Sequence, residues 1–235
     1  MFHSSAEYYD LIYSAFKDYA GEVAQVTTLL RRLNPECRTV LDVACGTGEH
    51  ARLLAADGFV VDGLDLDPAF IRIAAAKHSA GRFFEADMSD FHVPHRYNAV
   101  VCLFSSIGYL CTLDRVRRAL ICFREHLAAG GVVLVEPWLT PGVLDPTRMQ
   151  TNTGESQGVR VSRTARVEVE GSLSRLLFDY EIDENGVTRR VSEVHELGLF
   201  TTEEVMTTFR DAGLDVQHDP EGLTGRGLFI ARSVQ

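Results

Sequence analysis

The sequence of 235 residues lacks an apolar run of about 18 residues, the length that a membrane-spanning helix needs. Its first residues, MFHSSAEYYD, also lack the basic start and apolar core of a signal peptide. We therefore expect a cytoplasmic protein that neither crosses a membrane nor is exported.

Basic residues are outnumbered by acidic ones. The chain has 23 Lys and Arg against 33 Asp and Glu, which gives a formal net charge of -10. This balance argues against charge-driven binding to nucleic acid or to an anionic membrane. We expect a small-molecule partner instead, and a monomer or homodimer.

Patterns that hold metals or disulfides are missing as well. The histidines have no metal-ligand spacing, and we expect no metal. The cysteines are odd in number, form no C-x-x-C motif and are interpreted as reduced structural thiols. They are Cys37, Cys45, Cys102, Cys111 and Cys122.

The most informative segment present is VLDVACGTGEH, residues 40–50. An apolar strand leads into a turn with Gly46 and Gly48, and a helix is expected from Glu49. Glycines in such a turn let a ligand approach backbone N–H groups that a Cβ would block. The segment has no third glycine three residues later and no Gly-Lys-Ser/Thr, which counts against a dinucleotide fingerprint and a P-loop.

Acidic residues follow successive predicted strands. Asp42 lies near the end of the first strand, and Asp65 ends the second, seventeen residues after Gly48. That interval suits an acid that accepts hydrogen bonds from ribose hydroxyls. Asp87, after the third strand, can accept from an adenine amino group or act only as a turn residue, and the Met88 N–H can meet a ring nitrogen.

These residues would share one edge of a parallel sheet, where ligands bind. We interpret them as an adenosine site without a diphosphate, with S-adenosylmethionine as the ligand and S-adenosylhomocysteine as the product. The predicted cofactor-binding residues are Tyr19, Asp42, Ala44, Gly46, Gly48, Asp65, Leu66, Asp87, Met88 and Leu103.

Strands and helices alternate in the first part of the chain, which predicts a doubly wound, Rossmann-like α/β fold. A later helix at 202–212 and two closing strands complete a mostly parallel seven-stranded sheet. The predicted strands are 39–43, 59–64, 81–85, 97–103, 132–136, 214–218 and 227–232.

The alternation of predicted strands and helices stops after the fifth strand. Residues 141–158 are rich in Pro, Gly, Thr and Asn and are expected to form a loop. Three antiparallel strands follow, at 160–170, 173–183 and 187–197. We expect a β insertion over 140–198 that covers the substrate site of one domain spanning 1–235.

The N-terminal residues 1–20 are unusually aromatic. Two compatible interpretations are a helix packed on the core and a lid over the ligand with tyrosine hydroxyls facing it. The aromatic residues are Tyr8, Tyr9, Tyr13, Phe16 and Tyr19.

Several motifs resemble known families. D-x-A-C-G-T-G at 42–48, G-L-D at 63–65 and D-M at 87–88 are similar to class I S-adenosylmethionine methyltransferases. A narrower resemblance, over nearly the whole chain, is to bacterial N,N-dimethyltransferases of nucleotide-linked amino sugars, which act in making desosamine and mycaminose for macrolide antibiotics. It is carried by YDLIY (9–13), KDY (17–19), FSSIGYL (104–110), EHL (125–127), AGGVVLVEPW (129–138) and GLTGRGLF (222–229).

This resemblance implies N-methylation of a thymidine-diphosphate (TDP)-linked amino sugar. It implies catalytic roles for Tyr13 and His126, and a substrate contact for Arg226. From the residues alone, His126 could equally be a polar residue at a helix end, and Arg226 a solvated turn residue.

Other substrate contacts are predicted at Tyr9, Glu136 and Trp138; simple core packing is the alternative for the last two. A basic set in the insertion favours a nucleotide-sugar, unless its members are only solvated. Two other functions stay open: methylation of another small amine, amino acid, peptide or hydroxyl compound, and cofactor binding without catalysis. The basic set is Arg160, Arg163, Arg166 and Arg175.

Overall fold

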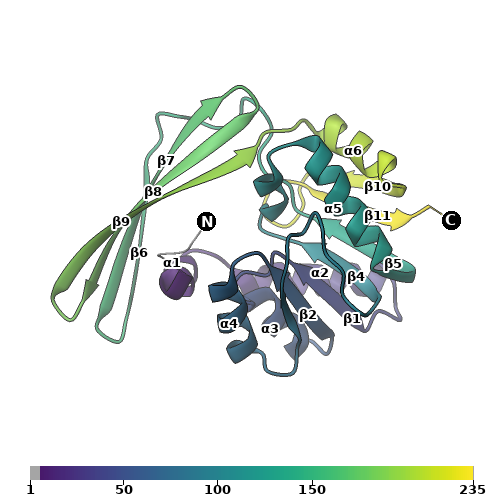
Figure 1. The fold of residues 1–235 in the computed structure, drawn as a ribbon, viewed down its shortest axis with the longest axis horizontal. Helices are drawn as coiled ribbons and strands as arrows, with labels where there is room; N and C mark the ends of the chain where they lie inside the picture. Colours follow the sequence, from purple (N-terminus) through teal and green to yellow (C-terminus); the bar gives the residue numbers. More distant parts are fainter. Residues whose placement is uncertain (1–5, 235) are drawn as a thin grey trace.

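The computed structural model describes residues 6–234, so the first five residues of the expected lid lie outside the described part. A seven-stranded sheet has the order β10-β11-β5-β4-β1-β2-β3 (Figure 1). β11 runs antiparallel to both of its neighbours, β10 and β5, and the other strand pairs are parallel, which confirms the predicted fold class. The strands are β1 (Thr39–Val43), β2 (Val60–Asp65), β3 (Phe83–Glu85), β4 (Tyr97–Cys102), β5 (Leu127–Val135), β10 (Leu214–Asp219) and β11 (Leu228–Ser233).

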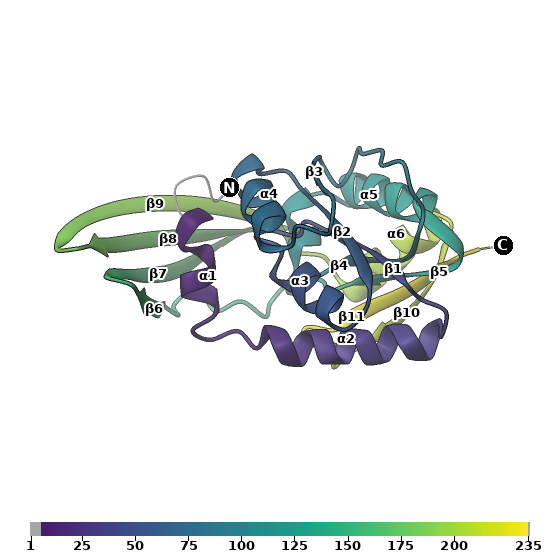
Figure 2. The ribbon, with the colours of Figure 1, turned by 90° about the horizontal axis from the view of Figure 1, so that it is seen from below.

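Helices cover both faces of this sheet, as Figure 2 shows for α2 and α5. Along β1, Val40 packs into the core on the α2 and α3 side, whereas Leu41 and Val43 face the opposite core with α5 and α6. Burial on both faces explains why the central strands are almost continuously apolar. The helices are α2 (Tyr19–Leu33), α3 (Glu49–Ala56), α4 (Pro68–Lys77), α5 (Leu113–Glu125) and α6 (Thr202–Asp211), with a short 3-10 helix η2 (Ser106–Leu110).

Local signals set the helix starts. The Asp67 side chain accepts a hydrogen bond from the Ala69 N–H at 2.8 Å, and Pro68 opens α4. Thr201 and Glu204 form a complete capping box at the start of α6. No helix within residues 6–234 is long and apolar enough to span a bilayer, and all five cysteines are free thiols.

The segment after β5 forms a separate antiparallel sheet of four strands, ordered β6-β7-β8-β9. It extends to one side of the main sheet (Figure 1). The strands are β6 (Gln150–Ser156), β7 (Val159–Glu170), β8 (Leu173–Glu184) and β9 (Val187–Gly198).

Strand β6 corrects the sequence-based expectation, which placed residues 141–158 in a loop. Its sequence, QTNTGES, has no apolar alternation, so no pattern identified it as a strand. Pairing with β7 and close packing against the N-terminal segment hold it instead. A Cβ built on Gly154 would lie 2.1 Å from the Leu11 carbonyl oxygen, so only glycine fits there.

The N-terminal segment, η1 (Ala6–Tyr8) and α1 (Tyr9–Tyr13), lies between the insertion sheet and the main domain (Figure 2). Ile12 is almost completely buried and shares a small core with Val161 and Ile182 of the insertion. The first of the two interpretations, a helix packed on the protein, therefore holds for the described part of this segment.

Candidate active site

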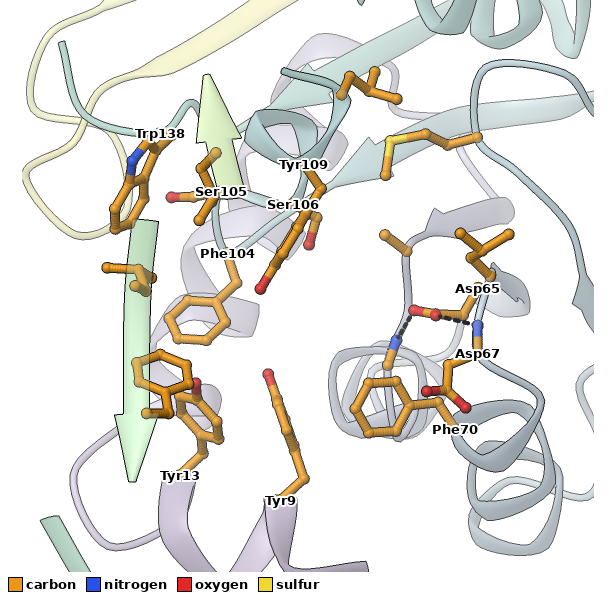
Figure 3. Close-up of a pocket in the computed structure, with 18 of the residues that line it drawn as sticks. Tyr9, Tyr13, Asp65, Asp67, Phe70, Phe104, Ser105, Ser106, Tyr109 and Trp138 are labelled. Atoms are coloured by element: carbon orange, nitrogen blue, oxygen red, sulfur yellow. Dashed lines mark hydrogen bonds between the residues drawn. The ribbon is translucent and has the colours of Figure 1, made fainter. Parts of the chain in front are cut away.

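A cavity of about 430 Å³ lies between the carboxyl ends of the central strands, α1 and the insertion sheet (Figure 3). Such a volume and position are typical of small-molecule sites in α/β folds. Ten of the predicted site residues line it: Tyr9, Tyr13, Ala44, Gly46, Asp65, Leu66, Asp87, Met88, Trp138 and Arg226.

A much smaller cavity adjoins this one and shares some of its lining. Three further predicted residues, Tyr19, Asp42 and Leu103, line the smaller cavity together with Gly46. The structure thus brings together thirteen of the predicted residues. Gly48, His126 and Glu136 are not among the lining residues of either cavity.

Asp65 is held rigidly at the end of β2. Its Oδ2 accepts a hydrogen bond from the Gly46 N–H at 2.9 Å, and its Oδ1 accepts one from the Asp67 N–H at 2.9 Å (Figure 3). Burial raises the pKa of this carboxyl, and the two backbone N–H groups oppose that rise. Each oxygen keeps a lone pair that can accept from a ligand hydroxyl.

Gly46 has a φ of +54°, and a Cβ built on it would meet nothing within 4 Å. A larger residue at this position would therefore place its side chain in the open cavity. Ala44 has a φ of +56°, a left-handed conformation that costs about 1 kcal/mol or more in a residue with a Cβ. In this strained turn the backbone of Ala44 and Gly46, rather than a large side chain, borders the cavity.

Asp42 is 2 % exposed, and its Oδ2 has no hydrogen-bond partner within the described residues. Burial raises the pKa of this carboxyl to about 6. A buried acceptor without a donor is costly, so a ligand donor at this position would be stabilising. An ammonium group is the chemical partner that suits this position.

Asp87 is already engaged by protein groups. Its Oδ2 accepts from Arg115 Nη2 at 2.8 Å, and its Oδ1 accepts from the Ser89 N–H at 2.8 Å. These bonds and the Arg115 charge hold the pKa of the Asp87 carboxyl below its usual value, against the effect of burial. The side chain still lines the cavity beside Met88.

Aromatic rings wall the middle of the cavity. The Tyr9 and Tyr13 ring centroids are 4.2 Å apart, and the Phe104 ring meets that of Tyr13 edge-on at 5.4 Å. In Figure 3 the hydroxyls of Tyr9 and Tyr109 point toward one another across the open space. Burial raises the pKa values of Tyr9, Tyr13 and Tyr109, which keeps these groups as neutral phenols.

Arg226 and Trp138 form the wall farthest from Asp65. Arg226 Nη1 donates to Ser105 Oγ at 3.2 Å, and its guanidinium lies over the rings of Phe104 and Trp138. Trp138 Nε1 donates to Ser174 Oγ of the insertion at 2.9 Å. Arg226 and Trp138, two predicted substrate-binding residues, therefore lie in the same wall of the cavity although they belong to separate segments of the chain.

His126 corrects a sequence-based expectation, because the structure does not bring it to the cavity. It caps the end of α5, is 4 % exposed and stacks on Phe91. Its Nε2 accepts from the Val93 N–H at 3.1 Å, while its Nδ1 lies 2.7 Å from the Cys122 carbonyl oxygen. With both ring nitrogens engaged in the protein, this geometry assigns it a structural role.

Glu136 is likewise turned away from the cavity and is completely buried. Its Oε2 accepts from the Phe104 N–H at 2.7 Å, and its Oε1 from the Thr224 hydroxyl at 2.5 Å. It thereby fixes the turn at Phe104 and Ser105, where both residues have positive φ values. Glu136 shapes the wall without contacting the cavity.

Gly48 allows close helix packing and does not line either cavity. It precedes α3 with a φ of +74°, and an added Cβ would lie 2.8 Å from the Ala74 Cβ of α4. The first glycine of the motif thus faces the cavity, and the second allows α3 and α4 to approach.

Sequence reasoning missed several lining residues. Phe104 and Tyr109 belong to the FSSIGYL motif, but nothing in their spacing marked them individually. Arg163 was one of four arginines in the basic set, and alternation along β7 was the signal that could have separated it. It shares a face of the insertion with the buried Val161.

The residues present fit S-adenosylmethionine. Asp65 would hold ribose hydroxyls, the open space at Gly46 admits the methionine part, and the unpaired Asp42 oxygen suits its ammonium group. When bound, this cofactor supplies an electrophilic methyl group.

Comparison with known proteins agrees with this geometry. Residues 40–131 match the family described as "Methyltransferase domain". A dTDP-3-amino-3,6-dideoxy-alpha-D-glucopyranose N,N-dimethyltransferase from Streptomyces fradiae is 39% identical over 95% of this chain and 89% of that protein.

Two solved structures are similar over nearly their whole lengths. DesVI from Streptomyces venezuelae has a TM-score of 0.91 and 35% identity, covering 97% of this chain and 98% of that one. CalS10 from Micromonospora echinaspora, an amino pentose methyltransferase solved with S-adenosylmethionine bound, has a TM-score of 0.83 and 32% identity, covering 93% of each chain.

The fold and the cavity thus define the class of S-adenosylmethionine-dependent methyltransferases. At this level of identity and coverage, the chain belongs to the sugar N-methyltransferase family within that class.

Proposed function

We propose that this enzyme N-methylates the amine of a TDP-linked amino sugar, releasing S-adenosylhomocysteine. The observation that carries the proposal is one cavity with two chemically different ends. One end has Asp65 and the Gly46 backbone. At the other, the guanidinium groups of Arg163 and Arg226 lie against the rings of Tyr13, Phe104 and Trp138 (Figure 3). The named relative from Streptomyces fradiae supports the substrate class.

In this proposal the neutral amine attacks the methyl carbon in line, and the carbon–sulfur bond breaks with its electron pair moving to sulfur. Positioning is the main task of the protein, because the methyl group is already activated. Tyr9, Tyr13 and Tyr109 are among the polar residues that line the cavity. Their hydroxyl oxygens would accept hydrogen bonds from the amine and orient its lone pair.

A phenol with a raised pKa stays protonated at neutral pH, so Tyr13 orients the amine rather than deprotonating it. Burial is the first cause of that raised pKa, and the Arg163 charge acts in the opposite direction. The amine releases its proton to water, before the first transfer and again before a second. The positive charge that the amine would gain on methylation would lie among aromatic faces, which favour cations.

The N-terminal segment within 1–20 acts as the lid, and the insertion within 140–198 acts as the cover of the substrate end. Tyr9 and Tyr13 reach the cavity from α1, and Arg163 and Phe178 reach it from the insertion sheet. A domain of 1–235 with these two covers would exclude water during transfer. The substrate is a small molecule rather than a nucleic acid, in keeping with the net charge of -10.

The test is steady-state kinetics with S-adenosylmethionine and a panel of acceptors, read by mass spectrometry of the products. The panel contains TDP-linked 3-amino and 4-amino deoxy sugars, the same sugars without the nucleotide, and free amino acids. Turnover of at least one nucleotide-linked sugar, with kcat/KM far above that of its free form, is expected. Turnover of the free amines alone would overturn the substrate proposal.

A further inference from the structure

Arg163 is a buried guanidinium with unused hydrogen bonds. It is 5 % exposed, and its Nη2 donates to Asn152 Oδ1 on the neighbouring strand at 3.2 Å. Its Nε and Nη1 have no hydrogen-bond partner within residues 6–234. A buried charge with unpaired donors costs free energy unless something else pairs with it.

The surroundings of Arg163 hold it toward the cavity. Its guanidinium carbon lies 4.8 Å from the Tyr13 ring centroid and 4.6 Å from that of Phe178. All three residues line the cavity. The Tyr13 and Phe178 rings and Asn152 fix the guanidinium, and the three N–H bonds of its Nε and Nη1 have no acceptor among the described residues.

The other arginines of the insertion are arranged differently. Arg166 is exposed and donates to Asp179 at 2.9 Å, and Arg175 is half-buried and pairs with Glu196 at 2.8 Å. Since side chains alternate across a sheet, Arg160 and Arg166 lie on the face of β7 opposite Arg163. The predicted basic set therefore divides into solvated strand faces and one buried group.

We propose that Arg163 binds the diphosphate of the nucleotide-sugar, jointly with Arg226 from the C-terminal loop. This inference rests on the proposed function and names the groups that recognise its phosphate part. A planar, permanently charged guanidinium matches phosphate oxygens through paired N–H donors. Arg163 selects sugars carried on a nucleotide over free amino sugars, because only the former place an anion beside it.

The test compares Arg163→Gln with Arg166→Gln, a matched loss of charge on the outer face of the same strand. Calorimetry would measure binding of thymidine diphosphate, thymidine and S-adenosylmethionine to each full-length protein. We expect Arg163→Gln to weaken thymidine diphosphate binding tenfold or more. Thymidine and S-adenosylmethionine affinities should stay within twofold of wild type, and Arg166→Gln should bind all three ligands normally.

Arg163→Lys provides a second readout if the glutamine variant is poorly folded. Lysine keeps the charge but loses the planar donor set, so thymidine diphosphate binding should fall severalfold and become more sensitive to salt. Wild-type thymidine diphosphate affinity in both variants, or equal losses for all three ligands, would overturn the proposal.

The two proposals fail in different ways. If wild-type protein methylates TDP-amino sugars while Arg163→Gln binds thymidine diphosphate normally, only the role of Arg163 is wrong. If wild-type protein binds no thymidine diphosphate and methylates no nucleotide-sugar, the substrate proposal falls, and the role of Arg163 falls with it.

Discussion

The carboxylate of Asp10 on α1 accepts a hydrogen bond from the Thr47 hydroxyl at 2.5 Å. Its other oxygen accepts from Lys77 Nζ of α4 at 2.7 Å. The N-terminal segment is thus fastened to the middle residue of the G-T-G turn that borders the predicted cofactor site. The packing of the N-terminal segment and the conformation of this turn are therefore linked through one side chain.

Asp10→Ala should loosen this connection. The Asp10 side chain is 41 % exposed, so solvent screening limits the expected loss to about 1 kcal/mol, or about fivefold in kcat/KM for S-adenosylmethionine. Glu7→Ala, which removes an exposed acid from η1, is the control. Steady-state kinetics would measure both, and unchanged kinetics in Asp10→Ala would show that the contact does not influence the site.

The Asp42 carboxyl should give S-adenosylmethionine binding a distinct pH dependence. Burial raises its pKa from 3.8 to about 6 in the free protein, and a ligand ammonium needs the ionised form. Affinity should therefore rise with pH through about 6, and be about tenfold weaker at pH 5 than at pH 7.5. Calorimetry at the two pH values would measure it, and Asp42→Asn should flatten the profile.

The same shift affects stability with the opposite sign. A carboxyl whose pKa is raised on folding stabilises the protein below pH 3.8, and this contribution is lost as pH rises through about 6. Wild type should accordingly lose about 2 kcal/mol relative to Asp42→Asn between pH 4 and pH 7. Parallel pH profiles of unfolding for the two proteins would contradict the assignment of this group.

Tyr13→Phe should lower turnover while leaving cofactor binding intact. The variant keeps the buried ring and loses the hydroxyl that would orient the amine, so kcat should fall about 10- to 100-fold. Tyr8→Phe is the control, because the Tyr8 hydroxyl contacts Glu184 and Arg189 at the insertion. Equal kcat values for Tyr13→Phe and wild type would remove the hydroxyl from the mechanism.

His126→Ala should reduce stability and spare chemistry. Losing the ring leaves the buried Val93 N–H without its acceptor, which costs about 1–3 kcal/mol of unfolding free energy. Chemical denaturation would measure this, with the exposed His92→Ala as control. A variant of normal stability whose kcat is strongly reduced would instead restore the catalytic role implied by the family resemblance.

Much of the fold could be predicted because the central strands are buried on both faces and each ends in a recognisable residue. Asp65 and Gly46 belonged to that regular part, and the structure places them at the cavity. Strand β6 could not be predicted, since its polar sequence takes its conformation from β7 and from the Leu11 backbone.

The substrate end was harder to predict than the cofactor end. Glu136 and Trp138 are two residues apart after the same strand, yet one holds the Phe104 turn and the other lines the cavity. Side-chain direction past a strand end depends on local turn geometry that spacing does not encode. Arg163 likewise needs the register of the insertion sheet to distinguish it from its solvated neighbours.

The most direct test of the account is a crystal structure of this enzyme with S-adenosylhomocysteine and a TDP-linked amino sugar. We predict ribose hydroxyls on Asp65 and the amine between the cofactor sulfur and the hydroxyls of Tyr9 and Tyr13. We also predict the diphosphate between Arg163 and Arg226. A sugar nucleotide bound outside this cavity, or bound with its amine remote from the sulfur, would contradict it.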